Sequence, residues 1–416
     1  MQDAFGRRWS IAASSVLSAI CVAIAFVCDI PDTIISRRAI FLAAKSLQGL
    51  GNGVILCTCE TYMSEILPPP LRGPGLALFP IFMLVGQLIG SIVVQAALEI
   101  EGAASYRTAF ASQWPFTALP LLVALFLPES PPWLIRLQKL DYARKCHQRL
   151  DSSKDESERE AAFEDFHQTI LLEQKQSAFS DASYRQCFQR TDTRRTIIII
   201  FARFIPMFFG LPLFSTASYF LQTISMSASR SIMFILIGVI LGLVSNISSF
   251  WTLTAFGRRT LLLVSLSIAT ILWLTIGIAG CFTGDARTWY VALGMMATLI
   301  TVGLGAWPAS HVVAAETSSL RLRARAQGIG GVASNVANGI FSIFLPYIYN
   351  PDQGNLGARV GFVFSAFCAI SVLFTWQYIP ELKDRTNSEI DRMFEERLPT
   401  RDFKKWSENT PRHITP

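Results

Sequence analysis

Long apolar runs recur along this chain, and they limit the fold more strongly than any other feature of the sequence. Each run has about 20 residues with few charges, the length that a helix needs to cross the hydrocarbon core of a bilayer. We therefore predict an all-α integral membrane protein with ten transmembrane helices. The ten segments are 11–28, 39–63, 75–98, 110–127, 196–221, 232–253, 261–282, 289–313, 329–349 and 360–379.

The composition excludes an ordinary soluble domain. Charged residues make up 16% of the chain and hydrophobic residues 51%, whereas about a quarter of a soluble domain is charged. There is no nucleophile–base set, metal-ligand cluster or phosphate-binding loop, so we expect no enzyme activity, no metal and no cofactor. Cys57 and Cys59 stand two apart on one predicted helix, where their side chains diverge, which favours a packing role.

Basic residues gather at the ends of the apolar runs. If the runs alternate in direction, most of these residues fall on one side, which the positive-inside rule makes cytoplasmic. Both termini are then cytoplasmic. The net charge is +6, but the basic residues form no continuous stripe with aromatic residues, so we expect no nucleic-acid partner.

A short motif occurs twice, 251 positions apart. The segment 4–8 (AFGRR) returns at 255–259, and at the same offset Glu65 matches Glu316 and Arg72 matches Arg323. The Pro-Glu pair at 128–129 returns at 380–381, within one position of that offset. Self-similarity at so long a period indicates a duplicated bundle of membrane helices.

The two copies differ in what precedes the motif. In the first half no apolar run precedes AFGRR, and four follow it before the Pro-Glu pair at 128–129. In the second half two runs precede AFGRR, and four follow it before the pair at 380–381. The repeat unit is therefore six helices, and we expect ten of twelve helices here, with the first two missing. We predict an incomplete N-terminal bundle at 1–135, a cytoplasmic helical linker at 136–195, a C-terminal six-helix bundle at 196–380 and a cytoplasmic tail at 381–416. Disorder is the alternative for the linker, because 151–161 is strongly charged.

Three motifs carry a family resemblance. Asp3 and the following Gly-Arg-Arg turn, the run at 64–73 (SEILPPPLRG) and the run at 128–134 (PESPPWL) resemble the sugar porter family of the major facilitator superfamily. Gly-Gln-Leu at 86–88, Tyr-Phe at 219–220 and the tail PELKDRT at 380–386 are similar to fungal general α-glucoside (maltose) permeases. The resemblance covers nearly the whole chain and implies the major facilitator fold.

The resemblance also implies a cytoplasmic gate. Glycine permits the tight turn before each arginine pair, and the arginines can bond to helix-end carbonyls or to acidic partners. Such charges lock the cytoplasmic side in the family; the alternative is that they only fix topology and helix ends. The expected gate residues are Asp3, Arg7, Arg8, Glu65, Arg72, Arg258, Arg259, Glu316 and Arg323, and Thr254 replaces the acidic residue that begins the second copy.

Polar residues inside the predicted spans are candidates for a substrate site, because they are costly to bury in a membrane. Gln87 matches a family glutamine that bonds to sugar hydroxyls, although a helix–helix hydrogen bond would also explain it. Asn335 and Asn338 share one helix face, and Asn335 matches a position that approaches sugar in the family. Tyr219 could cap a sugar or pack against lipid, and His311 could bond to substrate or to a neighbouring helix.

Lys45 lies well inside its predicted span. By resemblance it matches a basic residue that faces an aspartate on the first helix of proton-coupled relatives and tunes the pKa of that aspartate. The alternative is that the long side chain of Lys45 reaches the membrane interface.

We predict a plasma-membrane permease that carries an α-glucoside such as maltose together with protons, by alternating access. Its expected partners are the sugar, protons and the lipid bilayer, and we expect a monomer. One departure favours a different reading: residues 204–212 (FIPMFFGLP) are apolar where relatives carry glutamine and asparagine. The alternative is a non-transporting relative, either a sugar sensor or a decayed or truncated gene product.

Overall fold

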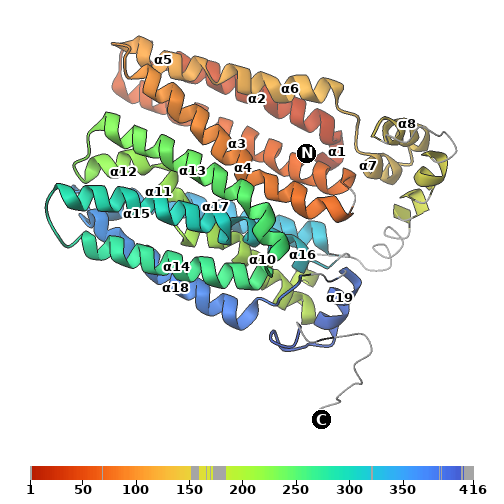
Figure 1. The fold of residues 1–416 in the computed structure, drawn as a ribbon. Helices are drawn as coiled ribbons and strands as arrows, with labels where there is room; N and C mark the ends of the chain where they lie inside the picture. The colour runs from red at the N-terminus through yellow and green to blue at the C-terminus, as the bar shows by residue number, and fades with distance from the viewer. Residues whose placement is uncertain are drawn as a thin grey trace. The chain divides into compact units, whose positions relative to one another are not determined.

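The structure, a computed structural model, describes residues 2–67, 69–150, 159–164, 166–168, 170–171, 184–319, 322–383, 385, 387–403 and 406. Every regular element in these ranges is a helix (Figure 1). The side chains of Asp3, Arg72 and Arg323 lie outside this description, as does most of the charged stretch at 151–161. The prediction of an all-α protein is confirmed.

Nine helical segments in the described ranges are long and apolar enough to cross a membrane. They are Arg7–Phe26, Ile34–Met63, Leu78–Ala97, Ala104–Phe126, Ala228–Ala255, Arg258–Ala279, Asp285–Thr317, Arg325–Tyr349 and Gly357–Tyr378. Each overlaps a predicted span. The remaining prediction, at 196–221, falls on three successive helices, Arg190–Phe208, Leu211–Ser215 and Ala217–Thr223, and is not among the nine segments.

The chain packs as two units, which we describe separately. The first comprises Met1–Leu76 and Ile92–Ser180, and the second Ala77–Ser91 and Asp181–Pro416. The helix α4 (Pro69–Ala97) contributes to both. The domain boundaries expected from the repeat stay a prediction.

In the first unit, α2 (Arg7–Phe26) packs against α3 (Ile34–Ile66) and α6 (Trp114–Phe126). The short α1 (Gln2–Phe5) precedes α2, and α5 (Ala103–Ala111) precedes α6. Two helices outside the spans follow: α7 (Pro131–Arg136) and α8 (Leu140–Leu150), which lie near the N-terminus in Figure 1. A small apolar core that includes Ile135, Cys146 and Phe163 holds them together, and burial raises the pKa of the Cys146 thiol.

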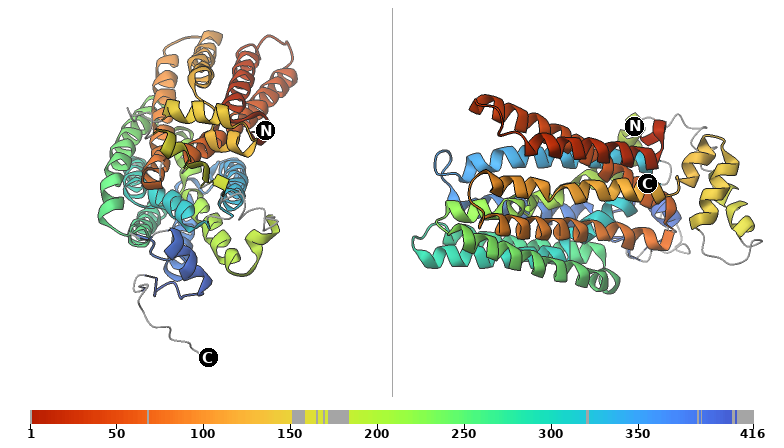
Figure 2. Two further views of the ribbon diagram at one scale, coloured as in Figure 1. Left: turned by 90° about the vertical axis from the view of Figure 1, so that its right-hand side faces the viewer. Right: turned by 90° about the horizontal axis from the view of Figure 1, so that it is seen from above.

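The second unit contains most of the buried core. Its long helices run lengthwise beside one another (Figure 2), and α14 (Arg258–Ala279) packs on both α15 (Asp285–Leu304) and α18 (Val360–Tyr378). The last described helix, α19 (Asn387–Glu395), returns to the second turn of α10 (Arg190–Phe208), where Arg195 pairs with Asp391. The elements are η1 (Tyr184–Phe188), α10 (Arg190–Phe208), α11 (Leu211–Ser215), α12 (Ala217–Thr223), α13 (Ala228–Ala255), α14 (Arg258–Ala279), α15 (Asp285–Leu304), α16 (Ala306–Thr317), α17 (Arg323–Tyr349), η2 (Gly357–Arg359), α18 (Val360–Tyr378) and α19 (Asn387–Glu395).

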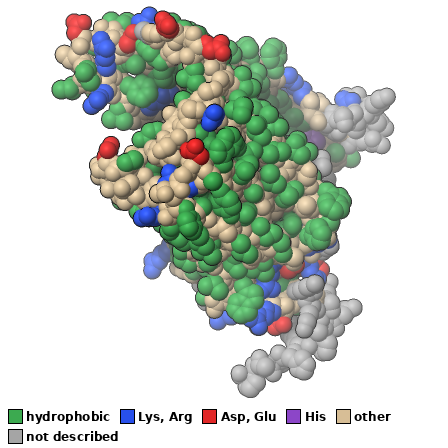
Figure 3. Space-filling view, turned by 60° about the vertical axis from the view of Figure 1, so that its left-hand side comes forward, with side chains coloured by type: hydrophobic (Ala, Val, Ile, Leu, Met, Phe, Trp, Pro, Cys, Tyr) green, Lys and Arg blue, Asp and Glu red, His purple; other side chains and the backbone are tan. Residues whose placement is uncertain are grey.

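Large apolar side chains are exposed along these helices. Ile271 on α14 is 61% exposed and Leu373 on α18 is 65% exposed, and hydrophobic side chains form a broad area of the face in Figure 3. A soluble protein rarely exposes so large an apolar surface. Such a surface suits contact with lipid, as expected for a membrane protein.

The interruption of the predicted 196–221 span has a local cause. Pro206 lacks a backbone donor, and Gly210 adopts a left-handed conformation with φ +99° that ends α10. Backbone carbonyls freed by such a break need new donors inside a membrane. The indole of Trp273 donates to the Phe209 carbonyl at 3.0 Å. The helix is therefore broken here, and a side chain of another helix satisfies one of the freed carbonyls.

Candidate functional site

A buried ion pair joins two of the expected gate residues in the first unit. Arg7 contacts Glu65 through two bonds, Nε to Oε2 at 3.0 Å and Nη2 to Oε1 at 2.7 Å. The Arg7 side chain is only 2% exposed. Ser130 also donates its hydroxyl to Glu65 at 2.6 Å. The carboxylate is thus held by a bidentate guanidinium and a hydroxyl, which offsets the cost of burying it.

Glu129 caps the helix that carries Arg7. Its Oε1 accepts the backbone N–H of Arg7 at 2.8 Å and that of Arg8 at 3.3 Å. The residue before α2 is Gly6, which has no side chain to act as a cap, and a Cβ there would lie 2.5 Å from Glu129 Oε2. Glycine therefore makes room for a carboxylate that sits at the positive end of the helix dipole.

The second unit repeats this arrangement. Arg258 Nη2 donates to Glu316 Oε1 at 3.1 Å, and the separation of 58 residues equals that of Arg7 and Glu65. Glu381 accepts the backbone N–H groups of Arg258 and Arg259, at 2.9 and 3.2 Å. The sequence repeat therefore corresponds to a repeat of contacts within each unit.

The second arginine of each motif bonds to the end of another helix. Arg8 donates to the carbonyls of Ala124 and Leu125 at the end of α6, and Arg259 donates to the carbonyl of Trp376 near the end of α18. These carbonyls have no partner within their own helix. The first arginine of each motif thus meets an acid and the second meets helix-end carbonyls.

The ion pairs of the two copies differ in how far they are exposed. Glu65 is 11% exposed and Glu316 is 26% exposed. The Thr254 hydroxyl, in place of an acid, bonds to carbonyls of its own helix. No contact is described for the side chains of Asp3, Arg72 and Arg323, which fall outside the described side chains.

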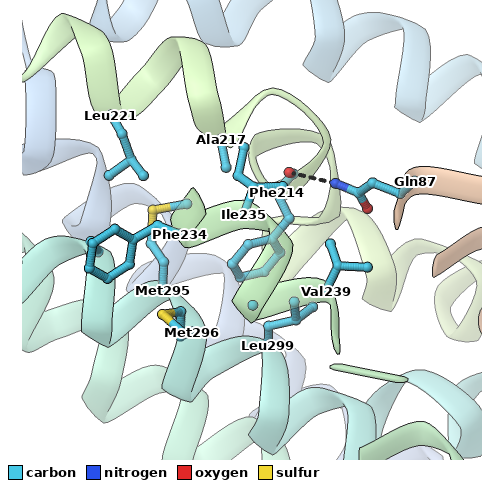
Figure 4. Close-up of a pocket in the computed structure, with 12 residues that line it drawn as sticks. Gln87, Phe214, Ala217, Leu221, Phe234, Ile235, Val239, Met295, Met296 and Leu299 are labelled. Carbon is cyan, nitrogen blue, oxygen red and sulfur yellow. Dashed lines mark hydrogen bonds between the residues drawn. The ribbon is translucent and has the colours of Figure 1, made fainter. Parts of the chain in front are cut away.

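Gln87 lies beside the broken helix. Its Nε2 donates to the carbonyl of Phe214 at 3.2 Å (Figure 4). That carbonyl stands where α11 ends and α12 begins. The helix–helix hydrogen bond weighed from the sequence is present, and among the described residues the Gln87 Oε1 accepts no hydrogen bond. The amide therefore has an acceptor oxygen left for a ligand.

His311 forms part of a polar cluster inside the second unit. Arg203 Nη1 bonds to His311 Nδ1 at 3.3 Å, and Arg203 Nη2 donates to Gln327 Oε1 at 3.1 Å. Because a guanidinium only donates, Nδ1 is the acceptor and the imidazole proton belongs on Nε2. The contact of His311 with a neighbouring helix, one of the two roles considered from the sequence, is present.

The other expected substrate residues form no described hydrogen bond with Gln87 or with the cluster of Arg203, His311 and Gln327. Asn335 and Asn338 are exposed on α17, and no hydrogen bond of theirs to another described residue exists. Tyr219 is 51% exposed, and its ring centre lies 6.1 Å from that of Tyr349. No described hydrogen bond joins Gln87, His311 and Asn335 to one another.

Lys45 lies in the first unit, in a setting of amides and aromatic rings. Its Nζ donates to Gln48 Oε1 at 2.9 Å, and Gln48 Nε2 donates to Gln113 Oε1 at 3.2 Å. The ammonium lies 4.8 Å from the centre of the Phe110 ring, close enough for a cation–π interaction. Among the described residues no carboxylate pairs with Lys45.

Several of these contact residues were not identified from the sequence. Glu129 and Glu381 were noticed only as parts of a repeated motif, although that repetition was itself a usable signal. Gln48 and Gln327 carried a weaker one, a polar residue one or two turns from another polar residue on the same helix. Gln113 lies at the junction of α5 and α6, and nothing local in the sequence marked it.

The whole chain resembles known transporters. The model of the family described as "Sugar (and other) transporter" matches residues 1–394. The chain belongs to this family. It is 28% identical to the MFS transporter fmqE of Aspergillus fumigatus over 97% of its own length and 74% of the relative's. It is also 26% identical to the α-glucosides permease MPH3 of Saccharomyces cerevisiae, over 99% and 69% of the two lengths, and 27% identical to the maltose permease MAL61, over 97% and 65%.

Solved structures support the same fold. The proton:xylose symporter XylE superposes with a TM-score of 0.74 at 18% identity, covering 94% of this chain and 84% of the other. The fucose:proton symporter FucP gives a TM-score of 0.54 at 12% identity. These identities establish the major facilitator fold alone. Together with the family assignment, they make the chain a multi-pass membrane transporter of the sugar transporter family and not an enzyme.

Proposed function

We propose that this transporter carries an α-glucoside such as maltose together with protons, by alternating access across the plasma membrane, with both termini cytoplasmic. The observation that carries the proposal is the position of Gln87, an amide in the middle of its own span that bonds to the break in another helix. The relatives of the chain include named maltose and α-glucoside permeases. Burying an amide inside a membrane costs free energy, so a residue of this kind is a candidate for a functional role.

The substrate would be held in the second unit. Gln87 Oε1 would accept a sugar hydroxyl. Asn335 and Asn338, exposed on one face of α17, would add further donors and acceptors, with His311 and Tyr219 at the edges of the site. A sugar needs such directional groups within a mostly apolar cavity.

The two repeated clusters would serve as the cytoplasmic gate. Ion pairs and caps can break and re-form in a polar setting, whereas a packed apolar seam separates less readily. The Arg258–Glu316 pair is the more exposed of the two, so we expect it to open at a lower cost than Arg7–Glu65.

Lys45 would couple transport to protons. A lysine inside a span is held by neighbouring amides here, and a carboxylate brought near it would have its pKa lowered by the positive charge. Protonation of that carboxylate would then depend on its distance from Lys45.

Uptake measurements test the proposal. The chain should be expressed in yeast that lacks maltose permeases, both on its own and with the first two helices of a maltose permease fused ahead of it. We expect labelled maltose uptake that is faster in acidic than in neutral medium and that Gln87→Ala abolishes. Gln95→Ala, on the same helix, is the matched control.

Two results would contradict the proposal. Uptake that is unaffected by Gln87→Ala would remove Gln87 from the site. Maltose binding without uptake in either form would favour the alternative, a non-transporting relative that senses sugar.

A further inference from the structure

An apolar pocket lies next to Gln87 in the second unit. Figure 4 shows Gln87 at its edge, with side chains from α12, α13 and α15 around the remaining space. About 390 Å³ of empty space, part of it open to the surroundings, lies among these residues. The lining consists of Gln87, Phe214, Ala217, Leu221, Phe234, Ile235, Gly238, Val239, Ala292, Met295, Met296 and Leu299.

This lining suits an apolar group and not a second sugar ring. Gln87 is its only side chain that can make a hydrogen bond, and one of its donors is already used by the Phe214 carbonyl. Each sugar hydroxyl that moves from water to such a surface loses a hydrogen bond without replacement, which costs free energy. The apolar segment at 204–209 on the same broken helix supplies no compensating group.

The residue types also suit a flat or flexible apolar group. Methionine adapts its shape and makes favourable contacts with aromatic rings, and Met295 and Met296, adjacent on α15, both line the pocket. Gly238 keeps part of the space open: a Cβ placed there would touch Met296 Cγ at 3.5 Å, an ordinary van der Waals distance.

We propose that this pocket binds the apolar aglycone of a glycoside, an aryl or alkyl group attached to the sugar that Gln87 holds. The inference rests on the proposed function and narrows its substrate class from α-glucosides in general to those with an apolar aglycone. Gln87 then stands at the boundary between the sugar and the aglycone.

Competing glycosides test the idea. Uptake of 4-nitrophenyl α-glucoside should be compared with that of methyl α-glucoside and maltose in the yeast described above. We expect the aryl glucoside to have a KM lower by about tenfold, the order that burial of a ring in an apolar site gives. Equal KM values for the aryl and methyl glucosides would overturn the inference.

Variants of Gly238 link the preference to this pocket. Gly238→Ala and Gly238→Val remove space stepwise, so the KM of the aryl glucoside should rise by about threefold and tenfold while that of the methyl glucoside stays within about twofold. Gly53→Ala is the matched control, because a Cβ at Gly53 on α3 has nothing within 4 Å. If Gly238→Ala, the milder change, affects both glucosides equally, the aglycone does not lie here.

Binding measurements separate this inference from the proposed function. Purified protein in lipid nanodiscs avoids alkyl glycoside detergents, which carry the groups under test. If no glucoside is taken up, the proposed transport fails. The pocket would still be supported if the protein binds labelled aryl glucoside more tightly than methyl glucoside and if Gly238→Val weakens that binding. Equal binding, or none, would indicate a pocket filled by lipid and would refute the inference.

Discussion

Replacing Gly210 by alanine tests how the broken helix is held. Two costs follow from its position. The left-handed φ of +99° costs a residue with a Cβ roughly 1–2 kcal/mol. The new Cβ would also lie 2.9 Å from Cζ2 of Trp273, whose side chain is fully buried, and overpacking a core costs roughly 1–3 kcal/mol. We expect Gly210→Ala to lower the free energy of unfolding by about 2–5 kcal/mol.

A double-mutant cycle separates the two costs. Trp273→Phe removes the ring atoms nearest to Gly210, so Gly210→Ala should cost at least about 1 kcal/mol less in that background. Gly284→Ala is the control for strain alone, because its φ is +121° and a Cβ there has nothing within 4 Å. SDS titration followed by circular dichroism measures all the variants. If the double variant loses the sum of the two single losses to within about 0.5 kcal/mol, the Cβ at position 210 does not clash with Trp273, and the packing argument is refuted.

Two other predictions concern the ends of helices. Glu129→Gln removes the charge from a carboxylate that caps α2, so the free energy of unfolding should fall by about 1.5–3 kcal/mol. Glu99→Gln, at an exposed site, should have little effect. Equal free energies of unfolding for the two variants in the same SDS titration would argue against the cap. Asp391→Asn removes the charge that pairs with buried Arg195, and trypsin should then cleave the tail faster than in wild type or in the exposed-site variant Asp402→Asn. Unchanged cleavage would show that α19 is held by its apolar contacts.

The sequence predicted the helices and the repeat well, because both depend on patterns along the chain. Apolar runs of bilayer length located the spans. The echo of AFGRR put a glutamate 58 residues after the first arginine of each copy, and in both copies these two residues are in contact. A duplicated segment preserves relative positions, so one copy predicts the contacts of the other.

The contacts between helices were much less predictable. Gln87 was identified as a polar residue inside a span, but its bond to the Phe214 carbonyl depends on where α11 ends. His311 meets Arg203 across 108 residues. Such contacts are set by the rotation and depth of each helix against its neighbours, and a single sequence records neither. The roles of these residues in transport stay predictions.

The distant caps have a consequence for synthesis of the chain. The N–H groups at the start of α2 have Glu129 as their acceptor, and this residue follows Arg7 by 122 residues. Those at the start of α14 have Glu381, which follows Arg258 by 123 residues. At roughly 5–20 residues per second, a ribosome needs about 6–24 s to make that length. Each of these two helices must therefore enter the membrane with its first turn uncapped. The glutamate of the Pro-Glu motif can cap that turn only after the ribosome has made the helices that lie between the two in the sequence.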